Sequence, residues 1–165
     1  MVGVDGDPSS DDAIADALRA LKTGMVGMLH VVHVIALGEL SVIQDARSLP
    51  LQSDVCEHAL SAARVRVGCM AGTLGVELRA DQVSFRVVVG DFVETLLLTG
   101  STCRADLMIV GGRGSAASER TKHAQALSSG AQCPVLIARA DGQAQRGSSE
   151  EAGISTPRQT HQEWP

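Results

Sequence analysis

Aromatic residues are almost absent from this 165-residue chain. It contains no Tyr, and its aromatic side chains are Phe85, Phe92 and Trp164. Proteins that hold single-stranded nucleic acid stack the bases on aromatic side chains, and this chain has no such platform. Its formal net charge is −5, and Lys and Arg are scattered rather than clustered, which disfavours contacts with a phosphate backbone. We therefore expect no nucleic-acid partner and an aliphatic lining for any ligand pocket.

Long apolar runs are also missing. No run reaches the roughly 18 residues that a membrane-spanning helix needs, and the first residues lack the charged and then apolar layout of a signal peptide. These absences predict a cytoplasmic protein with no membrane partner. The first apolar run begins at Met1 without a lead-in, which leaves a start further upstream open.

The cysteines do not form a recognisable motif. Cys56, Cys69, Cys103 and Cys133 are far apart, with no C-x-x-C pair and no His at zinc-finger spacing. We expect free and mostly buried thiols, because unpaired Cys behaves as a small apolar residue. No metal site is predicted.

Five short apolar runs indicate strands. They do not alternate apolar with polar residues, and Val and Ile dominate them, as in strands that are covered on both faces. The runs are Met1 to Val4, Met28 to Ile35, Ser84 to Val89, Leu107 to Val110 and Val135 to Ala138. Helical patterns separate them. The first follows Pro8, Ser9 and Ser10 and places Ile14, Ala17, Leu18 and Leu21 on one face, and the others run over about 54–71, 91–99 and 119–129. Alternating strands and helices predict an α/β fold with a parallel sheet and right-handed crossovers.

One domain is expected, over residues 1–140. Residues 36–53 form a long connection without clear periodicity. From about Ala140 onward Gly, Ser, Gln, Glu and Arg dominate, which predicts a disordered C-terminal tail over 141–165.

Two strand ends carry residues suited to a ligand. Asp5 and Gly6 follow the first strand, and Val110-Gly111-Gly112-Arg113-Gly114-Ser115 follows the fourth. Open parallel sheets bind ligands beyond the carboxyl ends of their strands. An acid could meet a ribose hydroxyl while glycine backbone donors approach phosphates. The alternative is two ordinary turns, with Asp5 capping the first. Neither the Walker pattern nor G-x-G-x-x-G is present.

Five segments together resemble the universal stress protein family. They are V-G-V-D-G-D-P-S-S-D-D-A (2–13), L-H-V-V-H-V (29–34), V-V-G-D (88–91), A-D-L-M-I-V-G-G-R-G (105–114) and C-P-V-L-I-A-R (133–139). The resemblance implies a Rossmann-like, five-stranded parallel sheet in the order 3-2-1-4-5 with helices on both faces, similar to adenine nucleotide alpha hydrolase-like folds. That order places the first and fourth strands side by side.

The same resemblance implies an adenine-nucleotide site. ATP-binding members of the family have the motif G-x-x-G, then nine residues, then Gly followed by Ser or Thr. Gly111 and Gly114 match the G-x-x-G half, and Val110 precedes it. Asp5 matches the acid at the adenosine end, and Val34 matches an apolar residue beside adenine. The implied cofactor is ATP or another adenine nucleotide, with Mg.

The second half of that motif departs from the family pattern. Thr121 and Lys122 stand where the family has Gly-Ser, and six residues rather than nine separate Gly114 from Thr121. A β-branched side chain hinders close approach of a phosphate. Arg113 and Lys122 could supply two cations, or could be solvated surface charges. We predict weak or lost ATP binding.

No catalytic constellation is evident. His30 and His33 lie three apart on one strand, so their side chains point to opposite faces. His123 lies in the altered segment and could reach a ligand, but it has no clear nucleophile partner.

Several interpretations therefore stay open. The first is a non-catalytic stress-response module with a weakened nucleotide cleft, and the others are an adenine-nucleotide-binding stress protein, an interaction module with a plugged pocket, and an adenylate-forming enzyme of a related fold. The resemblance also implies a homodimer that pairs through Val135 to Arg139, an edge strand.

Overall fold

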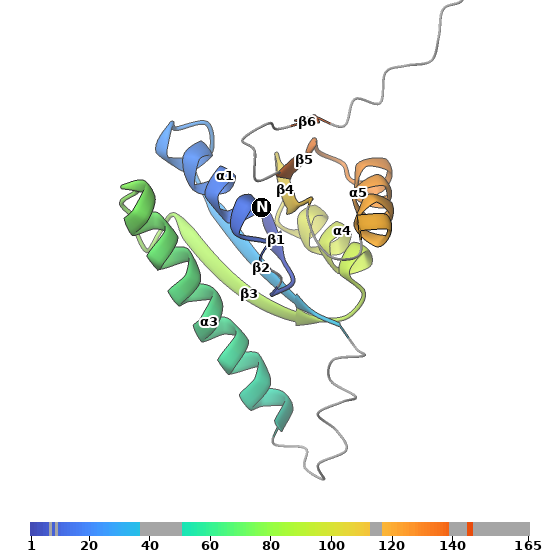
Figure 1. Cartoon of the computed structure of the whole chain (residues 1–165), viewed down its shortest axis with the longest axis horizontal. Helices are drawn as coiled ribbons and strands as arrows, with labels where there is room; N and C mark the ends of the chain where they lie inside the picture. Colours follow the sequence, from blue (N-terminus) through green and yellow to red (C-terminus); the bar gives the residue numbers. More distant parts are fainter. Residues whose placement is uncertain (7, 9, 37–50, 113–116, 139–144, 147–165) are drawn as a thin grey trace, which may run out of the picture.

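The sheet at the centre of the molecule contains five parallel strands in the order that the resemblance implies. The computed structural model describes residues 1–6, 8, 10–36, 51–112, 117–138 and 145–146. The strand order is β3-β2-β1-β4-β5, followed by a short β6 (Figure 1). The parallel strands are β1 (Val2–Val4), β2 (Leu29–Ile35), β3 (Val83–Val89), β4 (Met108–Gly111) and β5 (Val135–Ala138). The predicted α/β fold class and strand order are confirmed.

β1 lies in the middle of this sheet although it is only three residues long. Val2 pairs with Val31 of β2 on one side and with Ile109 of β4 on the other. Val2 and Val4 are buried, which explains why this strand reads as an unbroken apolar run. The five predicted runs match the observed strands to within about one residue at each end.

In the described part of the chain, two helices cover each face of the sheet (Figure 1). α1 (Ser10–Lys22) and α3 (Leu51–Leu74) pack against one face, and α4 (Phe92–Thr102) and α5 (Ala117–Gly130) pack against the other. In α1 the apolar stripe of Ile14, Ala17, Leu18 and Leu21 is buried, as its spacing predicts. The winding reverses between the two helix pairs, which makes the edge beside β1 and β4 a switch point.

β6 (Gln145–Arg146) adds a short antiparallel strand to the outer edge of β5. Leu136 is the partner of Arg146, and Ile137 is the partner of Gln145. This strand lies within the segment 141–165, for which the sequence predicts disorder. The remainder of that tail, and residues 37–50 of the long connection, lie outside the described residues.

The four cysteines are free in this structure. Cys69 is exposed and the other three are partly buried, so burial is less complete than expected. Burial raises the pKa of the Cys133 thiol. No helix in the described part of the chain is long and apolar enough to cross a membrane.

Candidate functional site

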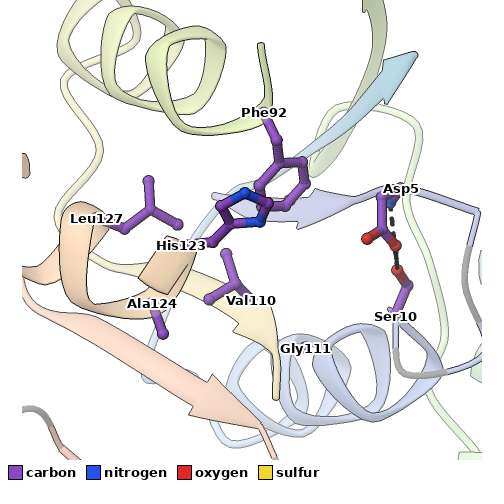
Figure 2. Close-up of a pocket in the computed structure, with 9 residues that line it drawn as sticks. Asp5, Ser10, Phe92, Val110, Gly111, His123, Ala124 and Leu127 are labelled. Carbon is purple, nitrogen blue, oxygen red and sulfur yellow. Dashed lines mark hydrogen bonds between the residues drawn. The ribbon is translucent and has the colours of Figure 1, made fainter. Parts of the chain in front are cut away.

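The carboxyl ends of β1 and β4 meet at one edge of the sheet, because Gly3 of β1 is the register partner of Val110 of β4. A pocket lies at this edge, between the two strand ends, the start of α4 and the middle of α5 (Figure 2). We call it the cleft pocket. It is lined by Gly3, Asp5, Ser10, Phe92, Val110, Gly111, His123, Ala124 and Leu127. Asp5 and Gly111, which the sequence analysis selected from two distant segments, thus line the same pocket.

The Asp5 carboxylate is bound by its own chain. The Ser10 hydroxyl donates a hydrogen bond to Asp5 Oδ1 at 2.8 Å (Figure 2). The same hydroxyl oxygen accepts from the Asp5 backbone N–H at 3.3 Å. Gly6 has a φ of +79°, which lets the chain turn back toward the start of α1. The Asp5 carboxylate thus has a partner at the start of α1, and a ligand hydroxyl would compete with Ser10 for Oδ1.

Two aromatic rings occupy the other side of the cleft pocket. The rings of Phe92 and His123 lie with their centroids 5.7 Å apart and their planes tilted by 31° (Figure 2). Phe92 is the first residue of α4, and Asp91 caps that helix by accepting a hydrogen bond from the Glu94 N–H at 2.9 Å. The cap thus fixes the start of α4 at the place where Phe92 meets His123.

The space that remains in the cleft pocket is very small. About 10 Å³ is open to a water molecule, which is room for about one water. Val110 and Leu127 are 2% and 0% exposed and close the floor, while the Phe92 and His123 rings fill the side.

Two other predicted site residues whose side chains the structure describes do not line the cleft pocket. Val34 is only 3% exposed and packs into the core beneath α4, so it does not line the cleft pocket. Lys122 is exposed and does not line it either. Thr121 lies within α5, about one turn after its start, but its side chain is outside the described residues. Arg113 and Gly114 also lie outside them.

The sequence and the fold were compared with those of known proteins. The model of the universal stress protein family matches residues 1–139. This chain belongs to the universal stress protein family. A universal stress protein solved in complex with cAMP is 20% identical, with a TM-score of 0.53, over 84% of this chain and 93% of that one.

Two further solved members of the family show the same fold. UspA from Lactobacillus plantarum is 16% identical, with a TM-score of 0.59, over 84% of this chain and 95% of its own. A family protein from Burkholderia pseudomallei is 19% identical, with a TM-score of 0.54, over 82% and 92%. The search of curated proteins finds no match.

The sequence analysis did not select five residues that line this universal stress protein's cleft pocket, which are Gly3, Ser10, Phe92, Ala124 and Leu127. Ser10 has a local signal, since it lies five residues after Asp5 at the start of a predicted helix. Phe92 has a weaker one, because it follows β3, a strand that is separated from β1 by β2. Only the path of α4 from β3 back over the sheet brings Phe92 to the cleft.

The remaining histidines of the universal stress protein domain lie apart from the cleft pocket's lining. His30 Nδ1 and the Ser84 hydroxyl of the neighbouring strand are hydrogen-bonded at 2.6 Å. Partial burial and the nearby charge of Arg86 lower the pKa of His30. Within the described residues, no group of three or more His, Cys, Asp or Glu side chains is placed to hold a metal ion.

Proposed function

We propose that this chain is a non-catalytic stress-response module in which the nucleotide-type cleft binds ATP weakly or not at all. The observation that carries the proposal is the cleft pocket, which has room for about one water between Asp5 and the Phe92–His123 ring pair. A nucleotide would have to separate these rings and compete with Ser10 for Asp5. Both changes subtract from the affinity that the site can offer.

The sequence of the phosphate loop supports the same conclusion. Relative to the family pattern, three residues are missing between Gly114 and Thr121, and Thr121-Lys122 replaces Gly-Ser. Each lost backbone donor to a phosphate is worth roughly 1.5–3 kcal/mol. Losing two or three such donors lowers affinity by several hundred-fold or more. ATP depends on this loop more than AMP does, so AMP and ADP should lose less affinity.

The second candidate function is binding of an adenine nucleotide through Asp5, Gly111 and Gly114, with Mg for a polyphosphate. It is favoured by the fact that Asp5 and Gly111 line one pocket. A family member with the same fold was solved with cAMP, a ligand with a single phosphate. Under this alternative, the Phe92 and His123 rings act as a gate that a nucleotide opens, and Arg113 or Lys122 binds the phosphates.

Absence of catalysis is part of the proposal. Nucleophilic hydrolysis needs an activated group with a base in reach. The Ser10 hydroxyl in the cleft pocket donates to Asp5, while His123 lies against Phe92. The third candidate, an adenylate-forming enzyme, therefore lacks support beyond the similarity of its fold.

Mass spectrometry of nucleotide released by denaturing freshly purified protein tests the proposal. The expected result is far less than one adenine nucleotide per chain, with AMP exceeding ATP in whatever is released. Asp5→Ala serves as the matched control, since it removes the acid of the implied site and defines the background of nonspecific carry-over. Stoichiometric ATP that Asp5→Ala abolishes would refute weak binding and establish the second candidate.

We also propose a homodimer that pairs through β5. The inner edge of β5 bonds to β4, while β6 occupies its outer edge beside Leu136 and Ile137. A second copy would have to displace this two-residue strand, which offers few backbone hydrogen bonds. Sedimentation at tens of micromolar, a concentration suited to assemblies of moderate affinity, should show a two-fold dimer. A monomer under these conditions would rule it out.

A further inference from the structure

A larger cavity lies at the opposite end of the sheet from the cleft pocket. It opens to solvent and is lined by the last turns of α4 and α5 and by the residues that lead into β4 and β5. We call it the amino-end pocket. Its volume is about 250 Å³, against about 10 Å³ in the cleft pocket by the same measure. A small organic molecule therefore fits here without any movement of the described residues.

The wall of the amino-end pocket has an apolar and a polar part. Leu97 and Met108 supply apolar surface, and Met108 is buried in the core. Ser101, Arg104 and Gln132 supply hydrogen-bonding side chains. Pockets for small ligands combine apolar walls with a few polar groups in this way. Cys133 completes the lining, and because burial raises the pKa of its thiol it adds no negative charge at neutral pH.

Arg104 has an unusual backbone that fixes its place at this pocket. Its φ of +51° makes it the one non-glycine residue with positive φ in the described chain. The Ala105 N–H donates to the Gly100 carbonyl at 2.9 Å, and the Arg104 N–H donates to the Ser101 carbonyl at 3.2 Å. These bonds close the C-terminus of α4 at a position where glycine is usual. Within the described residues, no carboxylate forms an ion pair with the Arg104 guanidinium.

The surrounding charges limit which ligand can bind. The carboxyl ends of α4 and α5 carry partial negative charge. Asp106 lies near enough to Cys133 to help raise the pKa of that thiol, and the Met1 ammonium lies near enough to lower it. The helix ends and Asp106 disfavour a ligand with several negative charges. The Arg104 guanidinium favours one carboxylate, which it can bind through two parallel hydrogen bonds.

We propose that the amino-end pocket binds a small monocarboxylic acid with a short aliphatic chain. Its carboxylate pairs with Arg104 at the rim, and its chain lies against Leu97 and Met108. For a ligand of about eight non-hydrogen atoms, the dissociation constant should be about 1 mM. The proposal does not depend on nucleotide binding, because the pocket lies at the other end of the sheet.

Protection of Cys133 from alkylation tests the proposal. Full-length protein reacts with N-ethylmaleimide at pH 8.5, with or without hexanoate, and mass spectrometry follows each cysteine. Hexanoate should slow modification of Cys133 several-fold and leave Cys69 unchanged, since Cys69 is exposed on α3 on the other face of the sheet. Hexanamide, which has the same shape without the charge, should protect much less. Equal protection by hexanamide, or none by hexanoate, would overturn the proposal.

Variants of Arg104 separate charge recognition from packing. Arg104→Gly suits the positive φ and Arg104→Gln keeps much of the side chain, and both should lose most of the protection. Arg86→Gln is the matched control, because it removes an exposed arginine from β3. In this variant hexanoate should slow the modification of Cys133 as much as in the parent protein. Protection that survives in both Arg104 variants would refute the carboxylate contact.

A second readout covers the case in which Cys133 does not react. The amide NMR signals of Ala105 and Gln132, assigned in the full chain, should shift and saturate with hexanoate. In Arg104→Gln the same shifts should need several-fold more hexanoate. Unchanged signals up to about 10 mM, ten times the expected dissociation constant, would overturn the proposal.

Discussion

The two ends of the sheet differ in a way that the family resemblance does not indicate. At the carboxyl end, where the resemblance implies a nucleotide, Phe92 at the start of α4 and His123 in the second turn of α5 line the cleft pocket, and about 10 Å³ is open. At the amino end, the last turns of the same helices carry Gly100 and Gly130 and leave about 250 Å³ open. Among the described residues, the amino end of the sheet therefore has the larger open volume of the two.

Shortening a buried side chain at the carboxyl end of the sheet should have the largest effect on stability. Leu127 is fully buried and lines the cleft pocket, so Leu127→Ala removes packing on a side that has no spare volume. We expect the free energy of unfolding to fall by about 2–5 kcal/mol, as in other buried leucine truncations. Urea unfolding at 25 °C measures it. A loss below about 1 kcal/mol would show that the cleft end is loosely packed, contrary to our description.

Removing the cap of α4 should have the next largest effect. Asp91→Ala deletes the carboxylate that accepts from the Glu94 N–H, next to the residue that fills the cleft. The free energy of unfolding should fall by about 1 kcal/mol. Asp81→Ala is the control, since Asp81 forms only an exposed ion pair with Arg79 and should change stability by less than about 0.5 kcal/mol. Equal urea midpoints for the two variants would contradict the capping role.

Enlarging a side chain at the open end should have a smaller effect. Ala131 lines the amino-end pocket, so the added methyl groups of Ala131→Val can enter existing space. Stability should change by less than about 1 kcal/mol, whereas overpacking a filled core costs about 1–3 kcal/mol. Thermal unfolding followed by circular dichroism measures the change. A loss as large as that of Leu127→Ala would remove the distinction between the two ends.

The smallest effect concerns pH and His30, near the start of β2. Partial burial and Arg86 lower the pKa of His30, so the folded protein binds fewer protons than the unfolded chain near its ordinary pKa. The contribution of neutral His30 to the free energy of unfolding is therefore present above about pH 6.5 and is lost as the pH falls. His30→Gln should flatten the decline in melting temperature between about pH 7.5 and 5. An unchanged slope would show that His30 does not contribute to it.

Most of the fold could be predicted from local signals. The runs around Val31 and Ile109 are strands covered on both faces, and such strands are recognisable without knowledge of their neighbours. The strand order came from the resemblance, because periodicity alone does not say which strands pair. β6 was not predicted, since two residues in a polar segment carry no apolar pattern and form a strand only beside β5.

The candidate site could be predicted only in part. Asp5 and Gly111 stand directly at strand ends, so the parallel topology is enough to bring them together. Val34, which the resemblance places beside adenine, is buried in the core under α4, and its contact with a nucleotide stays a prediction. The plug formed by Phe92 and His123 could not be foreseen, because it depends on how α4 and α5 pack against each other. That packing is a tertiary property to which no short motif corresponds.

The most direct test of the filled cleft is calorimetry of the full chain with AMP and with ATP plus magnesium, repeated on Phe92→Ala. Removing the Phe92 ring leaves Asp5 and Gly111 in place and opens the space beside His123. We predict millimolar or undetectable binding of both nucleotides by the parent chain, and at least several-fold tighter binding of AMP by Phe92→Ala. Micromolar or tighter binding of ATP by the parent chain would contradict the account, because the described pocket would then have to open readily onto a competent phosphate site.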